Sequence, residues 1–177
     1  MSKKSTSQKE EEQEKRDYEI YKELKNRYDL ENQRNNHLHD KAIQIASSTG
    51  TIMAIFIGLA TFSLEKISKS NIYFPWLTLV IMFSLTLFIA VIIITLFIIK
   101  PSEYTFTDPR QFIEEYKNKT WSELIHFYGG DIITAIEKNK EQNDEKVKRI
   151  LWALISLTAG LISIIIFTLL MIYALMN

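Results

Sequence analysis

The sequence contains no cysteine, and glycine and proline are scarce, with five and three residues among 177. The absence of cysteine excludes disulfide bonds, thiolate metal sites and a cysteine nucleophile. The few glycines and prolines leave little material for turns and long loops, which favours long helices. Basic and acidic residues number 21 each, so the overall charge gives no indication of nucleic acid as a partner.

Charged residues are also missing from three long stretches, because 42–64, 72–99 and 150–176 contain no Asp, Glu, Lys or Arg. The hydrocarbon core of a bilayer is about 30 Å thick and needs about 20 apolar residues in a helix. Each stretch meets this length, and the run Val91–Ile99 has almost none of the polar face that a soluble helical bundle requires. The sequence therefore predicts an all-α integral membrane protein with three transmembrane helices.

The charged remainder of the chain predicts a helical cytoplasmic stalk, because it is rich in Glu, Lys, Arg and Gln. In chain order the expected segments are a disordered tail (1–9), a cytoplasmic N-terminal helix (10–41), transmembrane helix 1 (42–64), a short outer loop (65–71), transmembrane helix 2 (72–99), a cytoplasmic helical segment (100–149) and transmembrane helix 3 (150–176). Within the second cytoplasmic segment we expect a short helix over Pro109–Lys119. A second one should end at Gly129-Gly130, and a third should start at Asp131 and continue into the last span.

The distribution of basic residues predicts an orientation in the membrane. Because the loop 65–71 is short, the segments 1–41 and 100–149 should face the same compartment. Together these two segments hold 19 Lys and Arg residues, against two in the loop. The positive-inside rule then places them in the cytoplasm of a cell with this protein in its inner or plasma membrane, and residue 177 outside. A cleavable signal peptide is not expected, since the first span follows a strongly charged segment.

Small residues recur every fourth position in the first span, and they predict a surface for close helix packing. The stripe comprises Ala42, Ala46, Gly50, Ala54 and Gly58. In the third span, Ser156, Gly160 and Ser163 share one face and are a candidate partner for it. The second span is bulky throughout and is expected to face lipid. The stripe packs either against the third span of the same chain or against another subunit, and homo-oligomerisation is expected in the second case.

A polar seam is expected in the stalk, where Asn139 and Asn143 occupy positions of a near-heptad, coiled-coil-like pattern that leads into the third span. Polar seam residues weaken a coiled coil but fix its register and its partner. We include in this predicted stalk seam Asp40 and Lys41, which close the N-terminal helix just before the first span. The seam either packs against the N-terminal helix or binds a ligand.

Residues that carry chemistry are few. The spans contain no carboxylate, basic residue or histidine, which disfavours proton relays, voltage sensors and coupled transporters. A polar patch at the start of the first span either bonds within its own helix or lines a hydrated pore; its residues are Gln44, Ser47, Ser48, Thr49 and Thr51. His37 and His39 point to different sides of a helix, and His126 is isolated. The sequence shows no phosphate-binding loop, nucleophile elbow or zinc motif. We therefore expect no enzyme activity, catalytic residue, metal or cofactor.

Two short patterns resemble a known class of proteins. Asp40-Lys41-Ala42 followed by Gly50 resembles the start of prokaryotic antiphage transmembrane effectors, namely Pycsar-type effectors and the SMODS- and SLOG-associating two-transmembrane effectors. Asn139, Asn143 and Lys146 before an apolar helix look like their closing helix. The resemblance implies a hydrophobic hairpin with helical cytoplasmic parts, a nucleotide second messenger or a partner protein as trigger, and damage to the membrane as output. This chain differs by its third span and by the lack of a recognisable nucleotide-sensing domain.

Two functions are compatible with these patterns. The first is a membrane-permeabilising effector that oligomerises and is triggered through its cytoplasmic helices in antiviral defence. The alternative is a non-catalytic membrane scaffold, or a small accessory subunit, that recruits partner proteins through the stalk. Under both, the lipid bilayer is the main contact of the apolar helices, and no nucleic acid is expected.

Overall fold

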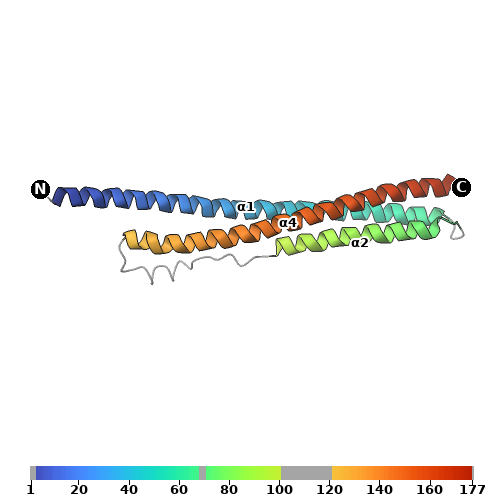
Figure 1. Ribbon diagram of the computed structural model, residues 1–177. Coiled ribbons are helices and arrows are strands. Elements are labelled where there is room, and N and C mark those ends of the chain that lie inside the picture. Colours follow the sequence, from blue (N-terminus) through green and yellow to red (C-terminus); the bar gives the residue numbers. More distant parts are fainter. Residues whose placement is uncertain (1–2, 68–70, 101–120, 177) are drawn as a thin grey trace. The chain divides into compact units, whose positions relative to one another are not determined.

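In the computed structural model, which describes residues 3–67, 71–100 and 121–176, three helices account for nearly all of the described chain (Figure 1). They are α1 (Lys3–Lys66), α2 (Phe74–Ile99) and α4 (Trp121–Met176). The described ranges contain no strand. The predicted all-α fold class is therefore confirmed.

Each of the three helices is long and apolar enough to cross a membrane. Helices α1 and α4 contain the first and third charge-free stretches, and α2 covers the second from residue 74 onward. Many of their large apolar side chains have no cover within the chain: Leu79, Phe83 and Leu169 are 59%, 55% and 63% exposed. Water disfavours an apolar surface of this extent, whereas lipid tails do not. The chain is thus a small membrane protein with three candidate spans.

Helix boundaries differ from the sequence-based expectation at two places, and one expected helix lies outside the described residues. The segment 1–9, expected to be a disordered tail, overlaps α1, which begins at Lys3. The expected helix over Pro109–Lys119 falls outside the described ranges. Gly129-Gly130 does not end a helix, because α4 continues through both glycines without a positive φ. That prediction was wrong.

The reason α4 tolerates this glycine pair is found in the packing of Gly129. A Cβ atom built there would already be in contact with the side chain of Leu24, 3.5 Å from its Cδ1 atom. The backbone carbonyl oxygen of Gly130 accepts a hydrogen bond from the Thr134 hydroxyl over 3.0 Å. A helical glycine costs about 1 kcal/mol relative to alanine. Tertiary contact between α1 and α4 offsets that cost here.

The chain divides into two compact units, each built from parts of α1 and α4. Among the described residues, unit 1 contains 3–36 and 121–144, and unit 2 contains 37–67, 71–100 and 145–176. Unit 1 therefore holds the charged parts of the two long helices, and unit 2 holds the three charge-free stretches together with α2.

The core of unit 2 is built from all three helices. Phe56 of α1 packs edge-on against Phe88 of α2 and Phe167 of α4, with ring centroids 6.4 and 5.4 Å away. All three rings are at most 2% exposed. Edge-to-face contact between aromatic rings adds about 0.5–1.5 kcal/mol to the effect of burial. These rings fix the three spans against one another.

Helix α2, which was expected to face lipid, also has a buried face that the sequence did not indicate. Its buried residues are Leu77, Ile81, Ser84, Phe88, Val91, Thr95 and Ile98. These positions recur every three or four residues and form a single stripe along α2. Bulky side chains surround this stripe on all sides, and therefore hydropathy alone did not distinguish it.

Unit 1 is held together by a mixed apolar and polar contact of α1 with α4. Tyr21 and Tyr128 pack with ring centroids 5.9 Å apart. Ile132 and Ala135 of α4 are buried farther along the helix. Burial raises the pKa of the Tyr128 phenol. Beyond Ala135 the buried residues of α4 in this unit become polar, which marks the region described next.

Candidate functional site

Unit 1 contains a polar layer between α1 and α4. We use this name for Glu31, Arg34, Asn139, Gln142, Asn143 and Asp144. Asn139 and Asn143 are fully buried, and Gln142 is half-buried. A seam of two helices would gain more from apolar residues at such positions, so the layer reduces stability.

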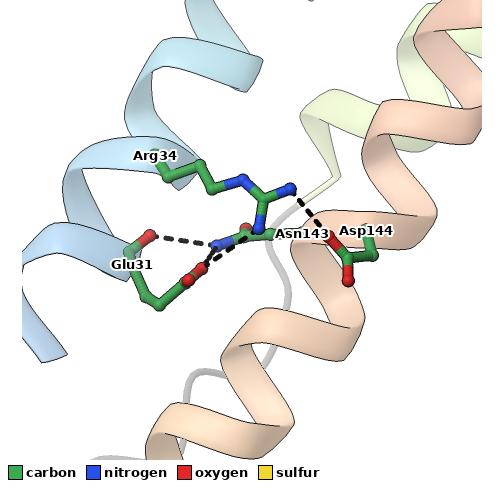
Figure 2. A network of polar contacts seen from close by, with 4 residues as sticks. All are labelled: Glu31, Arg34, Asn143 and Asp144. Atoms are coloured by element: carbon green, nitrogen blue, oxygen red, sulfur yellow. Dashed lines mark hydrogen bonds and ion pairs between the residues drawn. The ribbon is translucent and has the colours of Figure 1, made fainter. Parts of the chain in front are cut away.

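One half of the polar layer is well bonded (Figure 2). The Asn143 side-chain amide donates to the Glu31 backbone oxygen over 3.0 Å and to its carboxylate Oε2 over 2.9 Å. Arg34 Nη2 donates to Asp144 Oδ1 over 2.6 Å, and Arg34 Nη1 lies 3.6 Å from Glu31 Oε2. The hydrogen bond to Asp144 raises the pKa of Arg34, so the guanidinium stays charged. Glu31 thus accepts bonds from α4 while an arginine of its own helix offsets its charge.

The other half of the polar layer is not satisfied by the described residues. Neither Nδ2 nor Oδ1 of the buried Asn139 has a partner there, and Gln142 Oε1 has none either. A buried polar group left unbonded costs about 1–3 kcal/mol. The two halves are adjacent on α4, so a favourable network and an unfavourable one occupy neighbouring turns of a single helix.

Only part of the predicted stalk seam belongs to this layer. Asn139 and Asn143 come together there, on the side of α4 that contacts α1. Asp40 and Lys41 belong to unit 2, where both are exposed. Sequence reasoning missed Glu31, Arg34 and Asp144, since charged residues three or four apart on a helix usually form a solvated face. For Glu31 and Arg34, the one available signal was their position on α1 next to the asparagines Asn32, Asn35 and Asn36.

The buried lysine Lys146 lies in unit 2, just before the third charge-free stretch. It is 6% exposed, and loss of hydration lowers its pKa, with a further contribution from the neighbouring Arg149. Arg149 itself donates from Nη1 to the Phe97 backbone oxygen over 3.3 Å. Arg149 thus links the end of α2 to α4 beside the charge-free stretches.

The small-residue stripe of α1 turns from the core of unit 2 to its surface. Ala42 is fully buried, Ala46 and Gly50 are half-buried, and Ala54 and Gly58 are exposed. A Cβ atom added at Gly50 or Gly58 would meet nothing within 4 Å. A step of four residues exceeds the 3.6 residues of one helical turn, so a stripe with this spacing drifts around the helix.

Two of the small residues of α4, Gly160 and Ser163, contact α2. The hydroxyls of Ser163 and Ser84 lie 2.7 Å apart, within hydrogen-bond distance. Gly160 lies against the ring of Phe88 so closely that a Cβ atom would come within 2.6 Å of it. Ser156 is half-buried. These contacts explain how α2 approaches α4.

Exposed small residues on α1 form a second row, which we call the outer α1 face. Its members are Ser47, Thr51, Ala54, Gly58 and Thr61, all of them exposed. Their spacing alternates between four and three residues, which keeps them on one side of the helix. The buried residues Thr49, Phe56, Ala60 and Ser63 lie on the opposite side. The row is a flat surface that no part of the described chain covers.

The polar patch predicted at the start of the first span is divided between these two sides. Thr49 is buried and donates to the Ile45 oxygen over 2.7 Å, and Thr51 donates to the Ser47 oxygen over 3.2 Å. Both hydroxyls thus bond within their own helix. Gln44, Ser47 and Ser48 are exposed. Polar atoms therefore continue the outer α1 face toward the charged part of the helix.

A groove of about 380 Å³ lies between α1 and α4 of unit 1. Its lining includes Gln13, Asp17, Leu24, His126 and Gly129. Gln13 donates to Asp17 over 3.4 Å. His126 is exposed, as is His37, and His39 is half-buried. Among the described residues no three His, Asp or Glu side chains gather in a way that could hold a metal ion.

The described chain thus offers a buried polar layer in unit 1 and a row of small residues on the surface of unit 2. Neither holds a nucleophile beside a base or a set of groups around a reacting atom, so both suit packing and conformational change. No family model matches the chain, and no curated protein or solved structure matches it.

Proposed function

We propose that this membrane protein is a permeabilising effector, in which copies of the chain associate through the outer α1 face and open a polar path across the bilayer. The observation that carries the proposal is this face itself: five exposed small residues at heptad spacing, opposite the core of unit 2. Gln44 and Ser48, exposed beside it, add polar groups at the same end.

The physical argument rests on what drives helices together in lipid. Lipid tails are as apolar as leucine, so association depends on close packing and on hydrogen bonds between helices. Small residues allow two backbones to approach closely, and Gly58 leaves open space around its Cα. The amide of Gln44 finds no hydrogen-bond partner in hydrocarbon, but it does in a neighbouring copy or in water. Several copies arranged through this face would bring such groups together.

The proposed trigger acts on unit 1, where the chain is charged and accessible to soluble molecules. The resemblance to antiphage transmembrane effectors supports a nucleotide second messenger or a partner protein in this role. The protein acts without catalysis in this proposal, and its output is the loss of the membrane barrier. The rival function is a scaffold that recruits partners through unit 1. It does not explain why a row of small residues is exposed on a span.

The proposed orientation places the charged segments 1–41 and 100–149 in the cytoplasm. Cysteines introduced singly by Glu65→Cys and Glu141→Cys test it, because the native chain has none and both glutamates are exposed. An impermeant maleimide should label the first in intact cells and the second only after lysis. The reverse pattern would refute the orientation, and labelling of both in intact cells would refute the hairpin of spans one and two.

The proposed assembly predicts a loss of association when the outer α1 face is made bulky. Ala54→Leu and Gly58→Leu should each weaken association by about 1–3 kcal/mol through overpacking. They should leave the stability of the single chain unchanged, because both residues are exposed within it. Oligomer size in mild detergent and dye influx into cells that express the protein are the two measurements.

Thr158→Leu is the matched control, since it places the same side chain at an exposed position of a span outside the row. It should keep both oligomer size and influx. Unchanged assembly and influx in the Ala54 and Gly58 variants would contradict the proposal. Absence of influx from the unmodified protein under any trigger would favour the scaffold.

A further inference from the structure

Basic side chains gather in unit 2 where the charge-free stretches meet the charged segments. Residues 37–41, 100 and 145–149 lie at this end of the spans, and they include five basic residues against two acidic ones. The basic residues are Lys41, Lys100, Lys146, Lys148 and Arg149, and all but Lys146 are exposed. Side chains at the ends of membrane spans lie at the level of the lipid headgroups. This end of unit 2 therefore presents an excess of positive charge to the headgroups.

Helices α2 and α4 bring two of these cations close together. Arg149 Nη1 of α4 donates to the Phe97 backbone oxygen over 3.3 Å. Lys100 follows Phe97 by three residues, and its backbone N–H donates to the Leu96 oxygen over 3.0 Å, so that it closes α2 at the same place. The guanidinium of Arg149 thus lies beside the last turn of α2, which ends at Lys100.

Arg149 keeps the capacity to bind a further partner. Its ion pair with Glu145 spans 3.3 Å, and the two side chains are 44% and 60% exposed. An ion pair that is this accessible to water is weak. A guanidinium has five N–H donors, and the bonds to Phe97 and Glu145 use one at each of two nitrogens.

Lys146 has lost most of its hydration and lies near the same guanidinium. Burial and the charge of Arg149 both lower the pKa of Lys146. An anion beside Arg149 would offset this repulsion and favour the ammonium form of the lysine. We call Lys100, Lys146, Lys148 and Arg149 together the basic corner.

An apolar surface continues from the basic corner along α4. Trp152 follows Lys148 by four residues and Arg149 by three, so these side chains are neighbours on the helix surface. Trp152 and Ile155, three residues farther on, are exposed. Tryptophan is common at the headgroup level, because its ring contacts both apolar and polar groups there. A phospholipid has the same order of parts, a charged headgroup followed by acyl chains, whereas a soluble anion has the first part alone.

We infer that the basic corner binds the headgroup of an anionic phospholipid, with Lys100, Lys148 and Arg149 around the phosphate and the acyl chains against Trp152. The negative charge of the lipid complements the excess of basic residues at this end of the spans. Each Lys or Arg close to an anionic membrane raises the affinity about fivefold. The site lies within a single chain, so the inference goes beyond the proposed function and does not depend on the assembly of copies.

Trp152 is a natural reporter of the lipids at this site. Trp76→Phe and Trp121→Phe leave it as the one tryptophan of the chain. The full-length protein is placed in vesicles of phosphatidylcholine and phosphatidylglycerol, with bromine on the acyl chains of one lipid or of the other. Brominated chains quench the fluorescence of an indole that they contact. The relative binding constant obtained from this quenching should favour phosphatidylglycerol over phosphatidylcholine by about tenfold.

Lys148→Gln and Lys100→Gln should each lower this preference by about fivefold, whereas Lys148→Arg keeps the charge and should retain it. Lys66→Gln is the matched control, because it removes an exposed lysine at the other end of the spans, and it should change nothing. Equal quenching by the two lipids, or a preference that persists in both glutamine variants, would overturn the site. Loss of the preference after addition of inorganic phosphate, at matched ionic strength, would assign the basic corner to a soluble anion and would overturn the lipid.

Discussion

Gly160→Leu should destabilise unit 2 more than any other single substitution among its small residues. A Cβ atom at this position would lie 2.6, 3.1 and 3.2 Å from three atoms of the Phe88 ring. Phe88 is fully buried and packs edge-on against Phe56, so its ring has no free space into which to move. Overpacking in a close-packed core costs about 1–3 kcal/mol, and leucine adds three further carbons beyond the Cβ atom. We expect a loss of about 3 kcal/mol in the free energy of unfolding, measured by denaturant titration in mild detergent.

Gly58→Leu is the matched control for this prediction. It makes the same substitution in a span, but a Cβ atom there meets nothing within 4 Å. The single chain should keep its unfolding free energy, and Gly160→Ala should fall between the two because it adds only the clashing atom. Equal stability of the Gly160 and Gly58 leucine variants would show that α2 and α4 do not approach each other as closely as described.

The existence and extent of the spans could be predicted from the sequence because they depend on composition alone. A stretch without charge over more than 20 residues has one physical solution in a membrane protein, a helix that satisfies its own backbone. The continuity of α1 across residues 41 and 42 followed in the same way, since no glycine or proline interrupts it. The prediction that a helix ends at Gly129-Gly130 failed because helix propensity reflects only the local sequence. Gly129 lies close to Leu24 of another helix, and the local sequence gives no sign of that packing.

The choice of partner for each small residue could not be predicted. A small residue allows two backbones to approach but does not specify which backbone approaches. Gly160 contacts the bulky Phe88 of α2, and Ser163 finds Ser84, a serine within an otherwise apolar helix. Gly58 has the same chemistry as Gly160 and yet lies on the surface. Exposure, and not residue type, separates the two.

For the charged residues of the polar layer, too, the sequence did not indicate which helix supplies the partner. Asn139 and Asn143 could be predicted as seam residues because asparagine at heptad positions is a recognisable pattern. Glu31 and Arg34 could not, since their partners lie on another helix more than 100 positions away in the chain.

Proline substitutions where α1 and α4 pass from unit 1 into unit 2 should uncouple the trigger from the membrane. Both helices run through this region without a break. An interior proline removes one backbone hydrogen bond, clashes with the preceding turn and costs about 3 kcal/mol or more. Ile43→Pro in α1 and Val147→Pro in α4 place it at exposed side chains, so that the change falls on the backbone. Dye influx in response to the trigger should be lost in both variants.

Ile43→Ala and Val147→Ala are the controls, because they remove the same side chains and keep both helices continuous. They should retain influx. A helix transmits rotation or displacement only while its backbone hydrogen bonds are intact, and the proline variants interrupt them. The scaffold function predicts a different result, since recruitment needs the surface of unit 1 but not its connection to the spans: partner capture by unit 1 should then survive both prolines. Influx that persists with prolines in both helices would refute transmission through α1 and α4.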